Sequence, residues 1–218
     1  NQWLREYEKL LSRRNFLLRE RSSGELVEIY GENLINCGTK VVETRIRYLH
    51  RFVPCFQSFY QELSGEDVSL QVFYRPLGYR WEEGVEEGLR RAKKRVREEE
   101  KERGVTLFGP HRDEIMFLLR DREARNFASQ GEKKRLAISL RLAETSMVES
   151  FYRKEVVILV DDVFSELDKK RRALLWQKIK NGSQVFLTTT EEEEVKELRG
   201  SSPLSFFRIE GGRIEKGE

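Results

Sequence analysis

The chain has 218 residues, of which 36% are charged, and this length suits one large domain or two small ones. Basic residues exceed acidic residues by 41 to 38, and the resulting net charge of +3 is too small to predict a nucleic-acid partner by itself. No apolar run approaches the ~18 residues of a membrane-spanning helix, and Cys37 and Cys55 lie too far apart for a metal motif, so we expect a cytoplasmic protein with reduced thiols.

The first part of the chain predicts two antiparallel helices that form an arm. Apolar residues recur at helical spacing from Asn1 to about Glu20, and no capping residue precedes them, as in a chain cut before this helix. Ser22 and Glu25 have the spacing of a capping box, which predicts a second helix that extends to about Leu63. Pro54 lies inside that helix and is expected to kink or split it, because proline has no N–H to donate.

A strand and a third, highly charged helix follow. Apolar residues alternate from Val68 to Tyr74, which predicts a half-exposed strand, and Glu82 to Arg103 predicts a helix with Gly104 as its C-cap. This helix carries a basic run of Arg90, Arg91, Lys93, Lys94, Arg95 and Arg97. The run could bind a DNA backbone, or it could be a solvated helix face with ion pairs between residues four apart.

The segment that leaves the arm predicts a turn and a strand. His111-Arg112-Asp113 is expected to lie in the turn, Ile115 to Leu119 in the strand, and Asp121 to Glu123 in a hairpin-like turn that follows. A single histidine in such a turn is more often structural than catalytic, so we assign His111 no chemical step.

The next helix begins with a pattern that suits an anion. Ser129 and Glu132 have capping-box spacing, and Gln130 and Gly131 fall in the first turn. The first N–H groups of a helix have no partner within the helix and carry partial positive charge, so a phosphate could bind there. The same spacing also begins ordinary helices, so this pattern alone leaves both interpretations open.

Two adjacent carboxylates follow a strongly apolar strand. Val156 to Val160 contains only aliphatic residues, which predicts a central parallel strand that is covered on both faces. Asp161 and Asp162 come directly after it, at the end of a strand where open α/β sheets bind ligands. One carboxylate could hold Mg²⁺ while the other orients or deprotonates a water. The pair could also be a polar exit from the strand.

The last part of the chain predicts one more helix, a second buried strand and a closing hairpin. Asp168 is expected to cap the helix, and Val185 to Leu187 predicts the strand. Thr190 and Glu193 have capping-box spacing ahead of an acidic helix. Two short strands would then pair around Gly211-Gly212.

The order of these segments is more specific than any one of them. Residues 129–135 read S-Q-G-E-K-K-R, a helix of about 25 residues follows, and the aliphatic strand ends in Asp161-Asp162 ahead of Ser165-Glu166-Leu167-Asp168. This order resembles the signature motif, Walker B motif and D-loop of ABC-type ATPases. Within that superfamily, the D-D-V-x-S-E-L-D segment and Gly109-Pro110-His111-Arg112-Asp113 resemble RecF, a family of bacterial recombination mediators related to SMC-type heads.

The resemblance implies an α/β fold, namely the C-terminal part of an ABC-type ATPase head, with a central sheet flanked by helices, and an α-helical arm. Residues 1–104 would form the arm, with one strand near 67–75, and residues 105–218 the head lobe. A P-loop requires a Gly-Lys pair, and this sequence contains none. RecF proteins resemble other ABC ATPases in carrying that loop near the N-terminus. We therefore expect the C-terminal part of such a protein, which alone neither binds ATP tightly nor hydrolyses it.

ABC-type heads dock head to tail and enclose two nucleotides, so the implied cofactors are ATP and Mg²⁺. By this resemblance, Asp161 would hold Mg²⁺, and Asp162 would polarise the attacking water. The residues expected against the γ-phosphate of the partner's ATP are Ser129, Gln130, Gly131 and Glu132. Those expected along the dimer seam are Ser165, Glu166, Leu167 and Asp168. Thr189 and Thr190 occupy the position where relatives often have a switch histidine.

The implied function is that of a mediator in DNA replication, repair and recombination. ATP would close a homodimer on double-stranded DNA or at a gap junction, and slow hydrolysis would release it. The implied partners are RecR and RecO, which the protein would help to load recombinase at single-strand gaps in the bacterial cytoplasm. No membrane partner is expected.

Two other classes of function compete with this interpretation. One is another ABC-type ATPase, but an SMC-type head would have long coiled-coil heptads, and a transporter motor usually has the switch histidine. The other is a non-enzymatic helical module that binds DNA or protein and retains inactive ATPase motifs. The intact Asp161-Asp162 pair argues against that decay.

Overall fold

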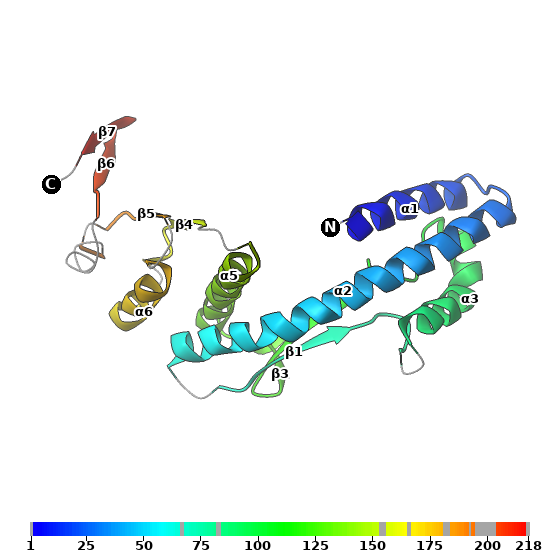
Figure 1. The fold of residues 1–218 in the computed structure, drawn as a ribbon, viewed down its shortest axis with the longest axis horizontal. Coiled ribbons are helices and arrows are strands. Elements are labelled where there is room, and N and C mark those ends of the chain that lie inside the picture. The colour runs from blue at the N-terminus through cyan, green and yellow to red at the C-terminus, as the bar shows by residue number, and fades with distance from the viewer. Residues whose placement is uncertain are drawn as a thin grey trace. The chain divides into compact units, whose positions relative to one another are not determined.

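The computed structural model describes residues 2–65, 68–81, 84–152, 156–164, 167–180, 184–191, 193–194 and 204–216 (Figure 1). The chain forms two compact units that alternate along the sequence. The first unit contains Asn1–Pro54 and Val68–Lys133, and the second contains Cys55–Asp67 and Lys134–Glu218. The predicted division into residues 1–104 and 105–218 remains a prediction.

The first unit is built on three helices, as the sequence predicts. They are α1 (Gln2–Arg19), α2 (Gly24–Ser64), whose last turns belong to the second unit, and α3 (Val85–Arg103). The helix α2 continues through Pro54, so Pro54 does not split it, and the kink expected there remains a prediction. Gly104 ends α3 in the left-handed conformation, with φ of 65°, and its N–H bonds to the carbonyl of Glu100, which confirms the predicted C-cap.

The three helices enclose one apolar core, and Figure 1 shows α1 and α3 beside the first half of α2. The buried side chains of this core are Tyr7, Leu34, Ile35, Cys37, Val41, Val42, Tyr79, Leu89, Ala92 and Phe108. Their helical spacing on α1, α2 and α3 is the pattern from which the sequence predicts an arm.

A small antiparallel sheet completes the first unit. It contains β1 (Leu70–Arg75), β2 (Glu114–Leu119) and β3 (Arg122–Glu123) in the order β1-β2-β3, and the short helix α4 (Ala124–Phe127) follows. The turn between β2 and β3 is made by Arg120 and Asp121, whose φ angles are 49° and 61°. Both predicted strands are present, and the predicted hairpin-like turn lies one residue earlier than expected.

The second unit packs helices against a parallel pair of strands. The strands are β4 (Val157–Asp161) and β5 (Gln184–Thr188), and the helices are α5 (Gln130–Tyr152), whose first turn belongs to the first unit, and α6 (Lys169–Ile179). Their shared core consists of Leu63, Leu142, Val160, Phe164, Leu167, Leu175, Trp176 and Ile179. Parallel strands packed against helices confirm the predicted α/β class.

One prediction about β4 is wrong. The strand has a buried face, on which Val160 is 7% exposed, but Leu159 on the opposite face is 76% exposed. Val157 and Phe186 lie on this open face, with exposures of 60% and 53%. Successive side chains of a strand alternate between faces, and the described helices of this unit cover only one of them.

The predicted closing hairpin is present. It pairs β6 (Phe207–Glu210) with β7 (Arg213–Lys216) through Gly211 and Gly212, whose φ angles are 56° and 78°. Glycine tolerates such angles because it has no Cβ. Among the described residues, none of the helices has the length and apolarity that crossing a bilayer requires.

Candidate functional site

The start of α5 is a closed capping box. The Glu132 carboxylate accepts hydrogen bonds at 2.8 Å from both the backbone N–H and the hydroxyl of Ser129, and the Glu132 N–H donates to that hydroxyl at 3.3 Å. Arg120, in the turn between β2 and β3, donates to the other carboxylate oxygen at 2.7 Å. The N–H of Ser129, followed by the Arg120 guanidinium, lowers the pKa of Glu132 to about 2. The sequence prediction of this cap is therefore confirmed.

The same turn leaves donors open to solvent. Ser129, Gln130 and Gly131 are exposed, and the first backbone bond of α5 runs from the Lys133 N–H to the Ser129 carbonyl. The N–H groups of Gln130 and Gly131 therefore precede the first intrahelical bond, and such groups suit an anion. Glu132 is also among the predicted phosphate contacts, but both of its carboxylate oxygens already accept hydrogen bonds from Arg120 and Ser129. Its carboxylate therefore stabilises the turn.

Asp161 and Asp162 lie exposed at the carboxyl end of β4. The Thr188 hydroxyl, at the end of the neighbouring strand, donates to Oδ1 of Asp161 at 2.5 Å. The Asp162 N–H bonds to the carbonyl and the hydroxyl of Thr188, each at 3.2 Å, and Asp162 has a φ of 50°. Thr188 thus fixes both acidic residues at the edge of the sheet.

The residues at this carboxyl end of the sheet suit a divalent cation whose other ligands are water and phosphate oxygens. Among the described residues, Oδ2 of Asp161 has no hydrogen bond, so it remains available to a cation. The described part of the chain contains no cluster of three or more acidic, histidine or cysteine ligands. One or two carboxylates, completed by water and phosphate oxygens, are the usual protein contribution to a Mg²⁺ site.

The two residues at the predicted switch position differ in their surroundings: Thr189 is held by hydrogen bonds, and Thr190 is exposed. The Thr189 hydroxyl donates to Glu194 at 2.8 Å and accepts from the Glu191 N–H at 3.1 Å, and Glu194 in turn pairs with Arg172 at 2.8 Å. The helix that Thr190 and Glu193 would cap is described only at residues 193–194, so that cap remains a prediction.

Sequence reasoning placed Thr188 only at the start of the threonine run beside the switch position and missed its contact with Asp161. The threonine run was compared with the switch histidine of relatives, which directs attention to Thr189 and Thr190. The available signal was the parallel pairing of two apolar strands, since Asp161 and Thr188 are register partners at their carboxyl ends.

The D-loop segment is partly described. Ser165 and Glu166 lie outside the described residues. Leu167 is buried in the core of the second unit, and Asp168 caps α6 by accepting from the Arg171 N–H at 3.0 Å, which also lowers the pKa of Asp168. Of the two described residues, only Asp168 is exposed, and its predicted place along a dimer seam remains a prediction.

The Gly109–Asp113 turn has structural contacts. Asp113 accepts hydrogen bonds from the hydroxyls of Tyr74 at 2.5 Å and Tyr79 at 2.6 Å. The Tyr7 hydroxyl lies 2.7 Å from Nδ1 of His111. These contacts join the turn to α1, to β1 and to the segment after β1, which supports the structural role expected of His111.

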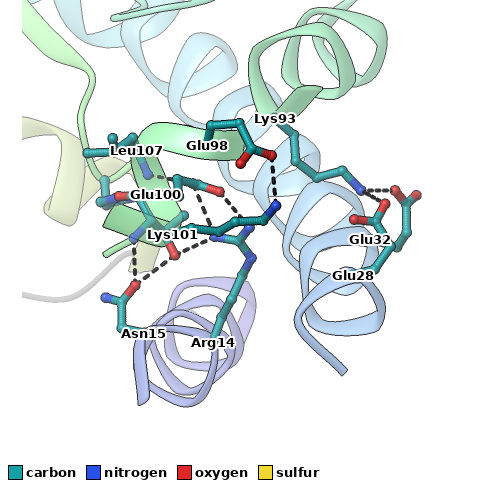
Figure 2. Close-up of polar contacts among 11 residues, drawn as sticks. Arg14, Asn15, Glu28, Glu32, Lys93, Glu98, Glu100, Lys101 and Leu107 are labelled. Carbon is teal, nitrogen blue, oxygen red and sulfur yellow. Dashed lines mark hydrogen bonds and ion pairs between the residues drawn. The ribbon is translucent and has the colours of Figure 1, made fainter. Parts of the chain in front are cut away.

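Most of the basic run of α3 is engaged within the chain. Lys93 is buried and pairs with Glu28 and Glu32 on α2, as Figure 2 shows. The remaining contacts of the run join Arg90 to Glu86 and Glu32, Arg91 to Glu87, and Arg95 to the carbonyl of Gly78. Lys94 and Arg97 are exposed and have no ion pair among the described residues. The ion pairs between residues four apart favour a charged surface helix, and DNA binding here stays a prediction.

One more capping prediction requires correction. The predicted box at the start of α2 paired Ser22 with Glu25, but α2 begins at Gly24 and the Leu26 N–H approaches the hydroxyl of Ser23 at 3.5 Å. The helix therefore begins one residue later than the spacing of Ser22 and Glu25 indicates.

Comparison with known proteins identifies the family. No protein-family model matches the chain. The chain is 37% identical over 215 residues to the DNA replication and repair protein RecF of Geobacter sp. (strain M21), covering 96% of this chain and 58% of that protein. It is 33% identical over 226 residues to the protein of the same name from Lactobacillus johnsonii, covering 99% of this chain and 60% of the relative.

Solved structures give the same result. The recombination mediator protein RecF-ATP of the RecFOR pathway has a TM-score of 0.81 at 27% identity, covering 99% of this chain and 58% of that one. The RecF-ATPrS structure has a TM-score of 0.82 at 28% identity, covering 98% and 57%. The chain thus spans less than two thirds of the relatives it matches. Sequence and fold together show that the chain belongs to the RecF family.

Proposed function

We propose that this chain works in a mediator of DNA replication, repair and recombination whose dimer closes on DNA with ATP and opens after hydrolysis. The observation that carries the proposal is the exposed Asp161-Asp162 pair, held by Thr188 at the carboxyl end of a parallel strand. Exposed carboxylates at this position suit metal and phosphate chemistry. The RecF relatives supply the biological context.

Asp161 and Asp162 would have different roles at the nucleotide. Asp161 would hold Mg²⁺ through Oδ2, while Thr188 keeps Oδ1 in place. Bound Mg²⁺ neutralises phosphate charge and helps to position the phosphates. Asp162 would accept a hydrogen bond from the attacking water and orient it. An aspartate reaches one methylene less far than a glutamate, which fits slow hydrolysis.

The start of α5 would act on the nucleotide of the partner subunit. The exposed amides of Gln130 and Gly131, with the Ser129 hydroxyl, would meet the γ-phosphate. Glu132 would keep this turn rigid through its bonds to Ser129 and Arg120. ATP would therefore join two subunits, and its hydrolysis would release them.

The rest of the nucleotide site must come from a P-loop, and this sequence contains no Gly-Lys pair to form one. We therefore expect the chain alone to bind ATP weakly and to lack ATPase activity. The proposed partners of the complete protein are double-stranded DNA, gap junctions, and RecR together with RecO, in the bacterial cytoplasm. The RecFOR pathway of the RecF structure supports RecR and RecO as partners, and the DNA replication and repair role of the relatives supports DNA.

A fusion tests this function. The segment of the Geobacter relative that this chain does not match is placed ahead of the chain, and the product is termed the joined protein. We expect Asp162→Asn to keep ATP-dependent dimerisation and to lower ATP turnover by at least about 100-fold. Asp161→Asn should in addition raise the Mg²⁺ concentration needed for half-maximal ATP-dependent dimerisation, because a ligand of the metal is lost. ATP turnover in Asp162→Asn equal to that of the unmodified joined protein would contradict the assignment.

A further inference from the structure

A cavity in the first unit is lined by no residue of the acidic pair or of the start of α5. It has a volume of about 710 Å³ and is bounded by the C-terminal half of α1, the first turn of α2 and the C-terminal half of α3. Its apolar lining comes from Leu17 and Leu18, each 5% exposed, and from Val27. Pockets of this volume commonly bind ligands, so the cavity can accept several side chains.

A buried ion pair and a buried lysine that pairs with two acids that are not buried join the walls of this cavity. Arg14 on α1 pairs with Glu100 on α3 at 2.7 Å, and both side chains are almost fully buried. Lys93 on α3 pairs with Glu28 on α2 at 2.5 Å and also contacts Glu32 (Figure 2). Arg14 and Lys93 are thus buried and already paired, so they shape the cavity but are not available to a ligand.

The rim of the cavity carries positive charge that the protein does not neutralise. Arg21, Lys94 and Arg97 line it, are exposed, and have no ion pair among the described residues. Lys101 pairs with Glu98 at 2.7 Å, and both side chains are exposed, so this pair is weak and can exchange partners. The free cations therefore outnumber the one remaining acid of the rim, Glu102.

We propose that this cavity binds an acidic segment of a partner protein that carries at least one apolar side chain. Carboxylates of the segment would pair with Arg21, Lys94 and Arg97, and its apolar side chain would cover Leu17 and Leu18. A peptide can supply both the negative charges and the apolar side chain that this cavity would bind. The proposal is independent of the nucleotide chemistry above, since no residue of the cavity belongs to it.

Duplex DNA fits the same surface less well. A phosphate backbone gains no favourable contact from the apolar side chains of the cavity. Its continuous negative charge would also be repelled by Glu98 and Glu102 on the rim. A peptide can place its carboxylates beside the cations and keep uncharged residues beside these two acids. The surface therefore favours an acidic peptide over a nucleic acid.

Binding of labelled probes to the 218-residue chain, followed by fluorescence anisotropy, tests the proposal. The first probe is a short acidic peptide with leucines at helical spacing, the second has serine in place of each leucine, and the third is duplex DNA of equal charge. We expect the leucine peptide to bind at least about tenfold more tightly than the serine peptide. Amide NMR signals of Leu17, Leu18 and Val27 should shift when that peptide binds.

A matched pair of double variants locates the site. Lys94→Glu/Arg97→Glu should weaken binding of the leucine peptide at least about tenfold, while Arg5→Glu/Lys9→Glu, with the same charge change on exposed residues outside the cavity, should alter it less than about twofold. NMR shifts of the unmodified chain decide the question if a variant fails to fold. No leucine-peptide binding up to about 1 mM would overturn the proposal. DNA that displaces the peptide and loses affinity in the same cavity variant would also overturn it.

Discussion

At the scale of single residues, Thr188 is the side chain that joins the acidic pair to the rest of the sheet. Its hydroxyl donates to Asp161 at 2.5 Å and accepts from the Asp162 N–H at 3.2 Å. A carboxylate that is held at one oxygen can present the other to a cation without first losing rotational freedom. Thr188 is thus a positioning residue for the proposed Mg²⁺ site.

Replacing Thr188 with valine keeps the shape of the side chain and removes its hydroxyl. In the joined protein, we expect Thr188→Val to raise the Mg²⁺ concentration needed for half-maximal ATP-dependent dimerisation by about tenfold, because Asp161 loses its orienting hydrogen bond. Titration with Mg²⁺, followed by light scattering, measures this shift. Thr188→Ser should restore the normal requirement. An equal shift in the serine and valine variants would indicate a packing effect instead.

Glu132 provides a pH-dependent test at the same scale. The pKa of Glu132 falls from 4.5 to about 2 in the folded chain, so its stabilising contribution is present above pH 4.5 and is lost as the pH falls towards 2. We expect Glu132→Gln to lower the free energy of unfolding by about 1 kcal/mol at pH 7, the typical value of a helix cap. Urea unfolding at several pH values measures the difference, which should shrink towards pH 2.

The exposed Glu8 on α1 is the control for this effect. Glu8→Gln should leave the free energy of unfolding unchanged within about 0.5 kcal/mol, as most surface substitutions do. A Glu132→Gln deficit that stays constant between pH 7 and pH 2 would show that the carboxylate charge is not the cause.

At the scale of elements, the ends of helices determine where the chain changes direction. Gly104 ends α3 with φ of 65°, and a Cβ at this position would lie 2.9 Å from Cγ of Arg19 on α1. The left-handed conformation costs most residues with a side chain about 1–2 kcal/mol. The absence of a side chain at residue 104 therefore permits both the turn and the close approach of α1.

This geometry predicts that Gly104→Ala lowers the free energy of unfolding by about 1–2 kcal/mol, through the backbone angle and the contact with Arg19. Gly24→Ala is the control, because a Cβ there would have no atom within 4 Å and the residue lies at the start of a helix. Chemical unfolding of both variants measures the two changes. If Gly104→Ala and Gly24→Ala change the free energy of unfolding equally, the role assigned to Gly104 is wrong.

The elements themselves were largely predictable, because helices and strands have different apolar periods. The cap of α5 and the C-cap of α3 were also predictable, since each depends on residues a few positions apart. The cap at Ser23 was missed by one residue, because the adjacent hydroxyls of Ser22 and Ser23 offer the same chemistry. Only the backbone path decides between such neighbours.

At the scale of the whole molecule, the sequence predicted the chemistry of the strands better than their surroundings. Val157, Leu159 and Phe186 have the composition of a covered parallel sheet, yet their side chains are more than half exposed. A run of apolar residues shows that a strand can be buried on both faces, but it does not show which segment covers each face. The contact of Thr188 with Asp161 could not be predicted from local spacing either, because 27 residues separate them and the strand pairing brings them together.

The association of two subunits through the start of α5 is the central claim, and light scattering of the joined protein with ATP and Mg²⁺ tests it most directly. We predict that the unmodified joined protein doubles its mass, as should a control with Ser150→Arg on the same helix. Ser129→Arg should remain a folded monomer, because the arginine would fill the space of the partner's γ-phosphate. Its melting temperature should fall by only about 2–4 °C, through loss of the Ser129 cap. If the Ser129→Arg protein dimerises as fully as the unmodified protein, the start of α5 does not meet the nucleotide of a partner.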